Sequence, residues 1–326
     1  MTKILITGGA GFIGSNLVKK YHKENKITVV DDLSMGKKQN IEGLDNVTFY
    51  KSSVLDKSFM TNLLMNEDFD YIFHLAAVAS VADSISRPIE TNEINFISTL
   101  NLLDILRQMK NSSLKRFIFT SSAAVYGDEK TLPKQEDSTI KPLTPYAIDK
   151  FAAEKYTVAY NSLYGIPTSC VRFFNVYGPK QNPSSPYSGV ISIVLDRFKS
   201  KILKDPKEFI MYGDGSQTRD FVYVEDVVEA LDIVSHSEES KGNVYNVGTG
   251  VETSLNDLIA STSLILGETI DIKYLASRDG DIERSFCSIE KLKKLGYKPR
   301  YSIEDGLREY IEFLELKKSY LSNIED

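Results

Sequence analysis

The chain has 326 residues, of which 42% are hydrophobic and 26% charged, and its formal net charge is −6. This length predicts about two domains or one large α/β domain, and the acidic balance argues against non-specific nucleic-acid binding and against a polybasic membrane surface. Two cysteines, Cys170 and Cys287, are too few for a disulfide framework, and neither they nor the three histidines have the spacing of a metal site. No apolar run reaches the roughly 20 residues of a membrane span, and the N-terminus lacks the pattern of a signal peptide. We therefore expect a soluble, cytoplasmic protein with no metal site.

Strand-sized apolar runs alternate with helical stretches through the first 170 residues. The runs are rich in β-branched and aromatic residues, and they predict strands at Ile4–Ile6, Ile27–Val30, Val47–Tyr50, Tyr71–Leu75, Phe117–Thr120 and Thr168–Val171. Helices are predicted at Ile13–His22, Phe59–Met65, Asn92–Lys110 and Tyr146–Tyr164. This alternation implies crossover connections and a doubly wound parallel sheet of the α/β class.

The pattern changes after Arg172, where a long loop rich in proline and glycine begins. Two later segments, Phe221–Val234 and Val244–Val247, again have an α/β pattern, and we expect them to return to the first sheet. The predicted first domain therefore comprises residues 1–171 and about 219–249. Residues 172–218 and 250–326 are predicted to form a smaller, mixed α/β domain.

A glycine-rich turn follows the first predicted strand. Gly8, Gly11 and Gly14 have the spacing G-x-x-G-x-x-G, and an amphipathic helix comes directly after them. Such a turn lets backbone N–H groups approach a pyrophosphate, and the positive end of the helix dipole adds to the attraction. An ordinary tight turn is the alternative, but the strand before and the helix after favour a dinucleotide site.

Asp31 stands at the end of the second predicted strand, 20 residues after Gly11. A carboxylate there can accept hydrogen bonds from the adenosine ribose and would repel a 2′-phosphate, so it favours NAD over NADP. Asp32 is either a second ligand of the ribose or an exposed loop residue.

A catalytic group is indicated by three further residues. Ser122 follows a buried strand, where open α/β sheets place their sites. Tyr146 and Lys150 lie four residues apart on a predicted helix and so share one face. A nearby ammonium favours the phenolate form, so we expect Lys150 to lower the pKa of Tyr146 and make it a general base.

The motifs together resemble the extended short-chain dehydrogenases/reductases, in the nucleotide-sugar epimerase/dehydratase group and closest to UDP-glucose and UDP-N-acetylglucosamine 4-epimerases. The resemblance covers nearly the whole chain through TGGAGFIG (7–14), HLAA (74–77), TSSAAVYG (120–127), YAIDK (146–150), RFFNVYG (172–178), GDGSQTRDFVYVEDVV (213–228) and SRDGDI (277–282). It implies a Rossmann domain that binds NAD tightly, a C-terminal domain that binds a UDP-sugar, and a homodimer formed through the helices Asn92–Lys110 and Tyr146–Tyr164.

The resemblance also implies roles for individual residues. Tyr146 would be the base, Lys150 would hold the nicotinamide ribose, and Ser122 would bind the sugar 4-hydroxyl. Either Ser53 or Asp56 would accept a hydrogen bond from adenine. The full set of implied cofactor ligands is Gly8, Gly11, Phe12, Ile13, Gly14, Asp31, Asp32, Ser53, Val54, Leu75, Ala76, Ala77, Thr120, Tyr146, Lys150 and Phe173.

The substrate residues are likewise implied by the resemblance. Arg219 and Arg278 would hold the diphosphate, with ion pairs to Asp220 or Asp279 as the alternative, and Asp281 would accept from the uridine ribose. The full implied set is Ser80, Asn95, Ser122, Ala123, Asn175, Arg219, Arg278, Asp281 and Ser285.

Two alanines bear on the type of reaction. Dehydratases and decarboxylases of this group have an acidic residue shortly after the catalytic Ser or Thr, because they need a further acid or base. Here Ala123 and Ala124 occupy those places, which favours a 4-epimerase. The rival hypotheses are a NAD-dependent reductase or 4,6-dehydratase of a nucleotide sugar, and a non-catalytic NAD-sensing module. The resemblance further implies that the small Ser285 leaves room for an N-acetyl group on the sugar, although Ser285 could simply be a structural residue on a strand.

Overall fold

The computed structural model describes residues 1–109, 112–181, 189–277 and 282–316. A seven-stranded parallel sheet forms the larger part of the molecule, in the order β11-β6-β5-β4-β1-β2-β3. Within it, the six strands β1 to β6 lie in the order β6-β5-β4-β1-β2-β3, which is that of a dinucleotide-binding doubly wound sheet. This order confirms the predicted class. The strands are β1 (Lys3–Thr7), β2 (Lys26–Asp31), β3 (Val47–Lys51), β4 (Tyr71–His74), β5 (Arg116–Ser122), β6 (Thr168–Phe173) and β11 (Val244–Val247).

Helices cover both faces of this sheet, because its strands are apolar on both sides. One face packs against α2 (Lys57–Asn66), α5 (Ser98–Gln108) and α6 (Pro145–Tyr164). The other packs against α1 (Phe12–Tyr21) and α8 (Val224–His236). The short helices are α3 (Val81–Ser86), α4 (Pro88–Asn92), α10 (Glu290–Lys293), η1 (Lys38–Asn40), η3 (Ala123–Tyr126) and η4 (Glu238–Ser240).

The predicted helix Asn92–Lys110 is interrupted. It is observed as the end of α4, a π-helical turn η2 (Glu93–Ile97) and then α5. Single π turns occur often at functional sites because they shift the register of a helix face. Residue periodicity alone does not show such a turn.

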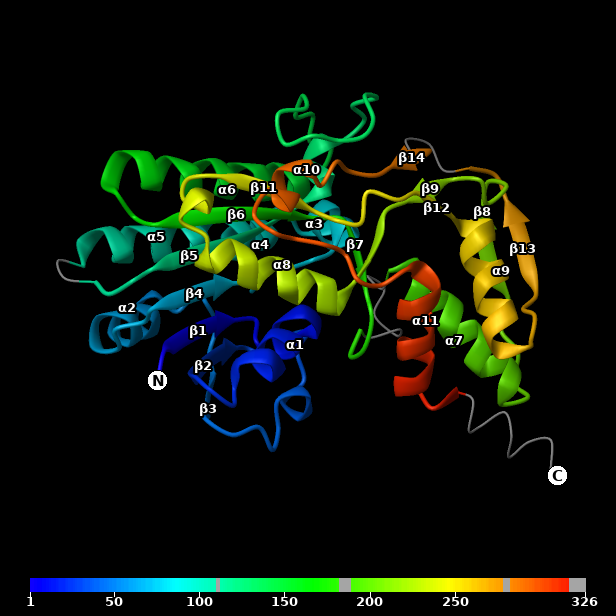
Figure 1. Ribbon diagram of the computed structural model, residues 1–326, viewed down its shortest axis with the longest axis horizontal. Coiled ribbons are helices and arrows are strands. Elements are labelled where there is room, and N and C mark those ends of the chain that lie inside the picture. The colour runs from blue at the N-terminus through cyan, green and yellow to red at the C-terminus, as the bar shows by residue number, and fades with distance from the viewer. Residues whose placement is uncertain (110–111, 182–188, 278–281, 317–326) are drawn as a thin grey trace.

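A second apolar core lies away from the sheet. It is built by α7 (Val190–Ile202), α9 (Leu255–Leu266) and α11 (Ile303–Phe313) together with the paired strands β8 (Phe209–Tyr212) and β13 (Ile272–Leu275). Figure 1 shows these elements grouped at the opposite end of the molecule from β1–β5. The remaining strands are β7 (Asn175–Tyr177), β9 (Thr218–Arg219), β10 (Phe221–Tyr223), β12 (Thr253–Ser254) and β14 (Arg284–Ser285).

The returning segments follow the prediction only in part. β11 joins the main sheet beside β6, as expected, and α8 covers that sheet. β10, however, pairs with β7 in a separate two-stranded sheet. Cys287, Ile289 and Leu292 pack into the core of the main sheet, so the packing does not follow the predicted boundary at residue 250. None of the described helices is long and apolar enough to span a membrane.

A buried ion pair ties α6 to β6. The Arg172 guanidinium donates from Nε and Nη2 to the two Glu154 carboxylate oxygens at 2.9 and 2.7 Å, and its Nη1 donates to the Tyr126 hydroxyl at 2.8 Å. Both charged side chains are at most 3% exposed. Because α6 also carries Tyr146 and Lys150, this pair fixes the helix that holds the predicted catalytic residues.

We expect Glu154→Ala to lower the free energy of unfolding by about 3–5 kcal/mol, because the Arg172 charge is then buried without a partner. Chemical unfolding of the purified variant measures this. The double variant Glu154→Ala with Arg172→Met removes both charges, and we expect it to regain much of the loss. An equal loss of unfolding free energy in the single and the double variant would contradict this assignment.

Candidate functional site

A cavity of about 860 Å³ lies at the carboxyl ends of the parallel strands. Gly8 follows β1, Asp31 ends β2, Leu75 follows β4 and Ser122 ends β5, so strand direction brings these residues to one edge. All the implied cofactor ligands line this cavity except Asp56, the alternative to Ser53, and Ser122 and Asn175 line it as well.

The glycine turn leaves no room for side chains. A Cβ on Gly14 would lie 2.2 Å from the Gly8 carbonyl oxygen, and one on Gly8, whose φ is +70°, would lie 2.8 Å from the Ala76 nitrogen. Gly8 donates its N–H to Val30 O at 2.8 Å, which ties the turn to β2. The backbone therefore lies bare at the N-terminus of α1, and this cradle fits the diphosphate of a dinucleotide.

Asp31 is buried beside this cradle. Its carboxylate accepts N–H hydrogen bonds from Ala10 at 3.0 Å and Leu33 at 2.9 Å. Burial raises the pKa of Asp31, and these backbone donors oppose the rise. Each carboxylate oxygen accepts more than one hydrogen bond, so Asp31 can still receive ribose hydroxyls. Asp32 is exposed and accepts from Ser34 N.

The two candidates for an adenine contact occupy different places. Ser53 lines the cavity, whereas Asp56 does not. The Asp56 side chain instead caps α2, where it accepts from Phe59 N at 2.9 Å. The geometry thus favours Ser53.

Tyr146, Lys150 and Ser122 meet in the cavity. Pro145 is the first residue of α6, and Thr144 caps the helix by accepting from Ala147 N. The Tyr146 phenol hydrogen-bonds with Ser122. The Lys150 ammonium is buried, donates to Thr120 O at 2.9 Å and lies 5.0 Å from the centre of the Phe119 ring.

The protonation states differ from the sequence-based expectation. Burial raises the pKa of Tyr146, and the Ser122 hydrogen bond opposes this only in part. Burial also lowers the pKa of Lys150 to about 8, against the raising effect of Asp149. In the chain alone the pKa of Tyr146 is therefore raised, against the expected lowering, because burial is the largest influence on this phenol.

His74 does not line the cavity but links the elements beside it. Its ring contacts Thr7 Oγ1 at 2.7 Å and Thr99 Oγ1 at 3.1 Å, which links β4 to β1 and α5. Burial first, and then the Lys150 charge, lower the pKa of His74 to about 3. It is therefore a neutral structural group at neutral pH.

Several implied substrate residues support the cavity wall instead of lining it. Asn95 accepts from Val78 N at 2.8 Å and donates to Val78 O at 3.1 Å, so its amide holds a neighbouring loop. Ser80 caps α3 by accepting from Asp83 N at 2.9 Å. Neither residue lines the cavity described above, and their direct contact with a substrate stays a prediction. Ala123 begins η3, next to the cavity.

Arg219 and Ser285 lie on adjacent strands, since β14 pairs with β9. Arg219 donates from Nη1 to Thr218 O and Ile282 O at 2.8 and 2.7 Å. Neither residue lines the cavity described here. Arg278 and Asp281 lie outside the described residues.

The sequence did not indicate some residues that line the cavity. They come from the loop after β2, from α3 and α4, and from the segment after β7: Gly36, Lys37, Asn40, Asp83, Arg87, Glu90, Lys180 and Gln181. Arg87 forms ion pairs with Asp83 at 2.7 Å and Glu90 at 2.6 Å. A Cβ on Gly36 would lie 2.8 Å from the Asp31 carboxylate, so the backbone there approaches this carboxylate closely.

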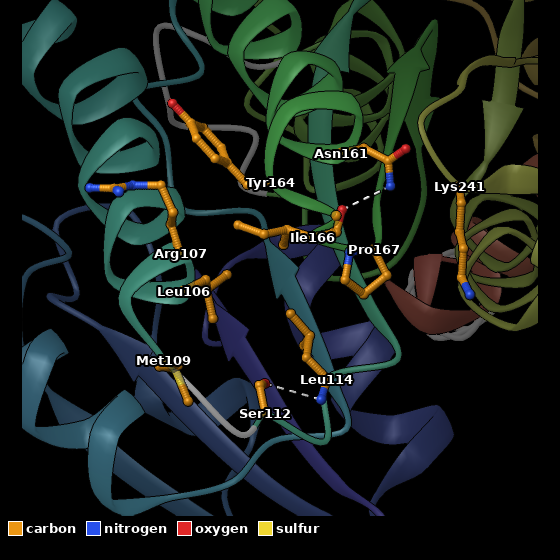
Figure 2. Close-up of a pocket in the computed structure, with 11 residues that line it drawn as sticks. Leu106, Arg107, Met109, Ser112, Leu114, Asn161, Tyr164, Ile166, Pro167 and Lys241 are labelled. Carbon is orange, nitrogen blue, oxygen red and sulfur yellow. Dashed lines mark hydrogen bonds between the residues drawn. The ribbon is translucent and has the colours of Figure 1, made fainter.

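A second cavity of about 380 Å³ lies at the amino ends of β5 and β6. Figure 2 shows side chains of α5, α6 and the segments before these strands around it. Its two cations are already paired, Arg107 with Asp104 and Lys241 with Glu238. It contains none of the catalytic candidates. Across the described parts of the chain, no group of His, Cys, Asp and Glu could hold a metal ion.

Comparison with known proteins gives the family. Residues 4–248 match the model of the NAD dependent epimerase/dehydratase family. A putative UDP-glucose 4-epimerase of Methanocaldococcus jannaschii is 36% identical over 96% of this chain and 98% of its own length. A UDP-N-acetyl-α-D-glucosaminuronate decarboxylase of Bacillus cytotoxicus is also 36% identical, over 95% of this chain and 97% of its own.

Solved structures support the same family. UDP-N-acetylglucosamine 4-epimerase from Methanobrevibacter ruminantium, in complex with UDP-N-acetylmuramic acid, is 36% identical with a TM-score of 0.88, over 96% of this chain and 98% of that one. UDP-glucose 4-epimerase from Thermotoga maritima, with UDP-glucose, is 35% identical with a TM-score of 0.87, over 100% of both chains. With its glycine cradle, its Tyr–Lys–Ser group and a match over most of its length, this chain belongs to the NAD dependent epimerase/dehydratase family of extended short-chain dehydrogenases/reductases.

Proposed function

We propose that the protein is a UDP-hexose 4-epimerase that inverts C4 through a transient 4-keto sugar. The observation that carries this proposal is the group Tyr146, Ser122 and Lys150 at the cavity edge, followed directly by Ala123 and Ala124. Proton transfer at the 4-hydroxyl needs only the first three residues. Dehydration needs another acid or base, and alanine cannot supply one.

Each of the three residues has a distinct task. Tyr146 takes the proton of the 4-hydroxyl, and Ser122 hydrogen-bonds both the phenol and that hydroxyl. Lys150, whose pKa of about 8 keeps it mostly protonated at neutral pH, holds the ribose next to the nicotinamide. When bound, NAD would supply the hydride acceptor and donor for C4 and a positive charge that favours the phenolate. The glycine cradle and Asp31 hold the dinucleotide.

The remaining carboxylates of the cavity do not replace the missing acid. Asp31 and Asp32 lie by the cofactor cradle, and their oxygens accept from neighbouring backbone N–H groups. Asp83 and Glu90 are ion-paired with Arg87. A decarboxylase or 4,6-dehydratase is the second candidate because such enzymes are among the relatives, but the two alanines count against it.

We further propose that the enzyme accepts N-acetylated hexoses in addition to glucose and galactose. Ser285 is small and partly buried, and it stands on β14 next to Arg219, whose guanidinium is proposed to hold the UDP diphosphate. A small residue there leaves volume for the 2-acetamido group. The name of the similar Methanobrevibacter enzyme agrees with this substrate class.

Direct assay tests the proposed function. The purified protein is incubated separately with UDP-glucose and UDP-N-acetylglucosamine, and the 4-epimers are resolved by chromatography. Formation of either 4-epimer without net NADH turnover supports an epimerase. A 4-keto-6-deoxy sugar would identify a dehydratase, and net consumption of external NADH would identify a reductase.

We expect Tyr146→Phe to reduce kcat for epimerisation by at least about 100-fold, because the proton acceptor is lost while the ring packing remains. Bound NAD and the melting temperature should stay close to those of the wild type. Activity near the wild-type level would show that another group is the base.

Ser285→Tyr tests the sugar preference. We expect kcat/KM for UDP-N-acetylglucosamine to fall by roughly 10- to 200-fold, a steric penalty of about 1–3 kcal/mol. Activity with UDP-glucose should persist, because that sugar has only a hydroxyl at C2. Equal loss on both sugars, or none, would remove Ser285 from the specificity of the enzyme.

We also propose a homodimer formed through η2, α5 and α6. Apolar side chains on this side are exposed in the single chain, including Ile97 (36% exposed), Ile148 (52%) and Tyr156 (42%). The Tyr156 ring also contacts Phe96 of η2, at 5.4 Å between ring centres. Exposed apolar side chains on these packed helices are of the kind that a symmetric partner covers.

The dimer is tested with Tyr156→Glu. We expect this charge to weaken self-association by at least about 10-fold, as for a buried aromatic contact at an interface. Sedimentation at micromolar concentration measures the mass. Leu264→Glu, on the far helix α9 where Leu264 is 83% exposed, is the control and should leave the mass unchanged. A monomeric wild type would contradict the proposal.

A further inference from the structure

Two segments that line the large cavity are in direct contact with one another. One is the loop after β2, which contributes Lys37 and Asn40 to the lining. The other follows β7 and contributes Lys180 and Gln181. They are about 140 residues apart in the sequence, so contact between them is a tertiary feature of the site.

Direct hydrogen bonds join the two segments. The Lys180 ammonium donates to Asn40 O at 2.7 Å. The Asn40 amide in turn donates to Ala10 O at 2.8 Å, within the glycine turn. A second link runs from the Asn16 amide on α1 to Pro179 O at 3.2 Å. The chain thus forms a continuous hydrogen-bonded connection from the glycine turn, through Asn40, to Lys180.

The segment that carries Lys180 is held in place from its other side. Tyr310 of α11 is 1% exposed, and its hydroxyl donates to Gln181 O at 3.2 Å. Lys180 itself has φ +72°, in the left-handed region where a residue with a side chain is strained. Such a conformation persists only where surrounding contacts enforce it. The backbone is therefore fixed so that the ammonium reaches across to Asn40.

The Lys180 ammonium carries its charge on the wall of the cavity. In the ranges that the structure describes, no carboxylate forms an ion pair with Lys180, and burial together with the Lys19 charge lowers its pKa. One of the three N–H groups of the ammonium is used on Asn40 O. A partly buried cation on the wall of a cavity that fits a diphosphate is favourably placed towards that anion.

We propose that Lys180 and Asn40 form a latch that closes the cavity over bound NAD and sets the rate at which NAD leaves. The latch consists of the Lys180–Asn40 and Asn40–Ala10 hydrogen bonds. It rests on the use of NAD by this family and on no assumption about the sugar. A positioning residue of this kind retains the cofactor between turnovers, which a 4-epimerase needs because the hydride must return to the same sugar.

The test measures release of NAD from the holoenzyme. Purified protein is loaded with isotopically labelled NAD, excess unlabelled NAD is added, and the label that remains on the protein is followed with time. We expect Lys180→Met to accelerate exchange by about 10-fold or more, as for the loss of one hydrogen bond with a charged donor. Asn40→Ala keeps the carbonyl but removes the bond to Ala10 O, and it should accelerate exchange as well.

Matched variants separate the latch from general effects. Lys19→Met removes a neighbouring exposed cation that does not line the cavity, and exchange should stay at the wild-type rate. Lys180→Arg should restore slow exchange. The KM for the UDP-sugar should change less than twofold in all four variants.

The latch is overturned if exchange from Lys180→Met and Asn40→Ala equals that of the wild type, or if Lys19→Met accelerates it equally. A wild-type protein that binds no NAD at all would overturn the proposed function together with the latch. Slow NAD exchange in the wild type, lost in both latch variants, supports the latch whichever sugar the enzyme uses.

Discussion

The site depends on one constraint, which is the absence of space around the glycine turn. A Cβ at Gly14 would lie 2.2 Å from Gly8 O, and one at Gly8 would lie 2.8 Å from Ala76 N. The turn can therefore pack against β4 and α1 only as bare backbone. This packing places the N-terminus of α1 at the edge where β1, β2, β4 and β5 end, and the parallel direction of these strands brings Asp31 and Ser122 to the same edge.

Much of the first half of the molecule could be predicted because its signals are local. Apolar runs that alternate with helical stretches predicted the strands of the main sheet, and the spacing of the glycines predicted the turn after β1. Tyr146 and Lys150 were recognised by a four-residue interval on a helix with a clear beginning at Thr144 and Pro145. In each case neighbours in sequence determine the structure. The same holds for Asp31, whose distance from the glycine turn follows from the length of one helix and one strand.

The rest depends on contacts between distant residues, which a single sequence does not reveal. Asn95 and Ser80 have side chains suited to a ligand, but the fold uses both to hold backbone. Lys180 and Asn40 were not marked by a motif, and their contact joins segments far apart in the sequence, one of which is held by Tyr310 of α11. The pairing of β10 with β7 was missed for the same reason. Two three-residue strands are too short to show where they pair.

The electrostatics around Tyr146 and Lys150 connect the proposed latch to the proposed chemistry. Burial raises the pKa of Tyr146 and lowers that of Lys150, so the protein's own groups favour the neutral phenol. Lys150 directs its ammonium at Thr120 O. In the proposed reaction, the positive charge that favours the Tyr146 phenolate would include the nicotinamide of bound NAD. By linkage, an interaction with NAD that stabilises this phenolate would also strengthen the binding of NAD when Tyr146 is ionised. Under this proposal, retention of NAD and ionisation of Tyr146 are coupled, and residues that hold the cofactor at the far end of the cavity contribute to the reaction without touching the sugar.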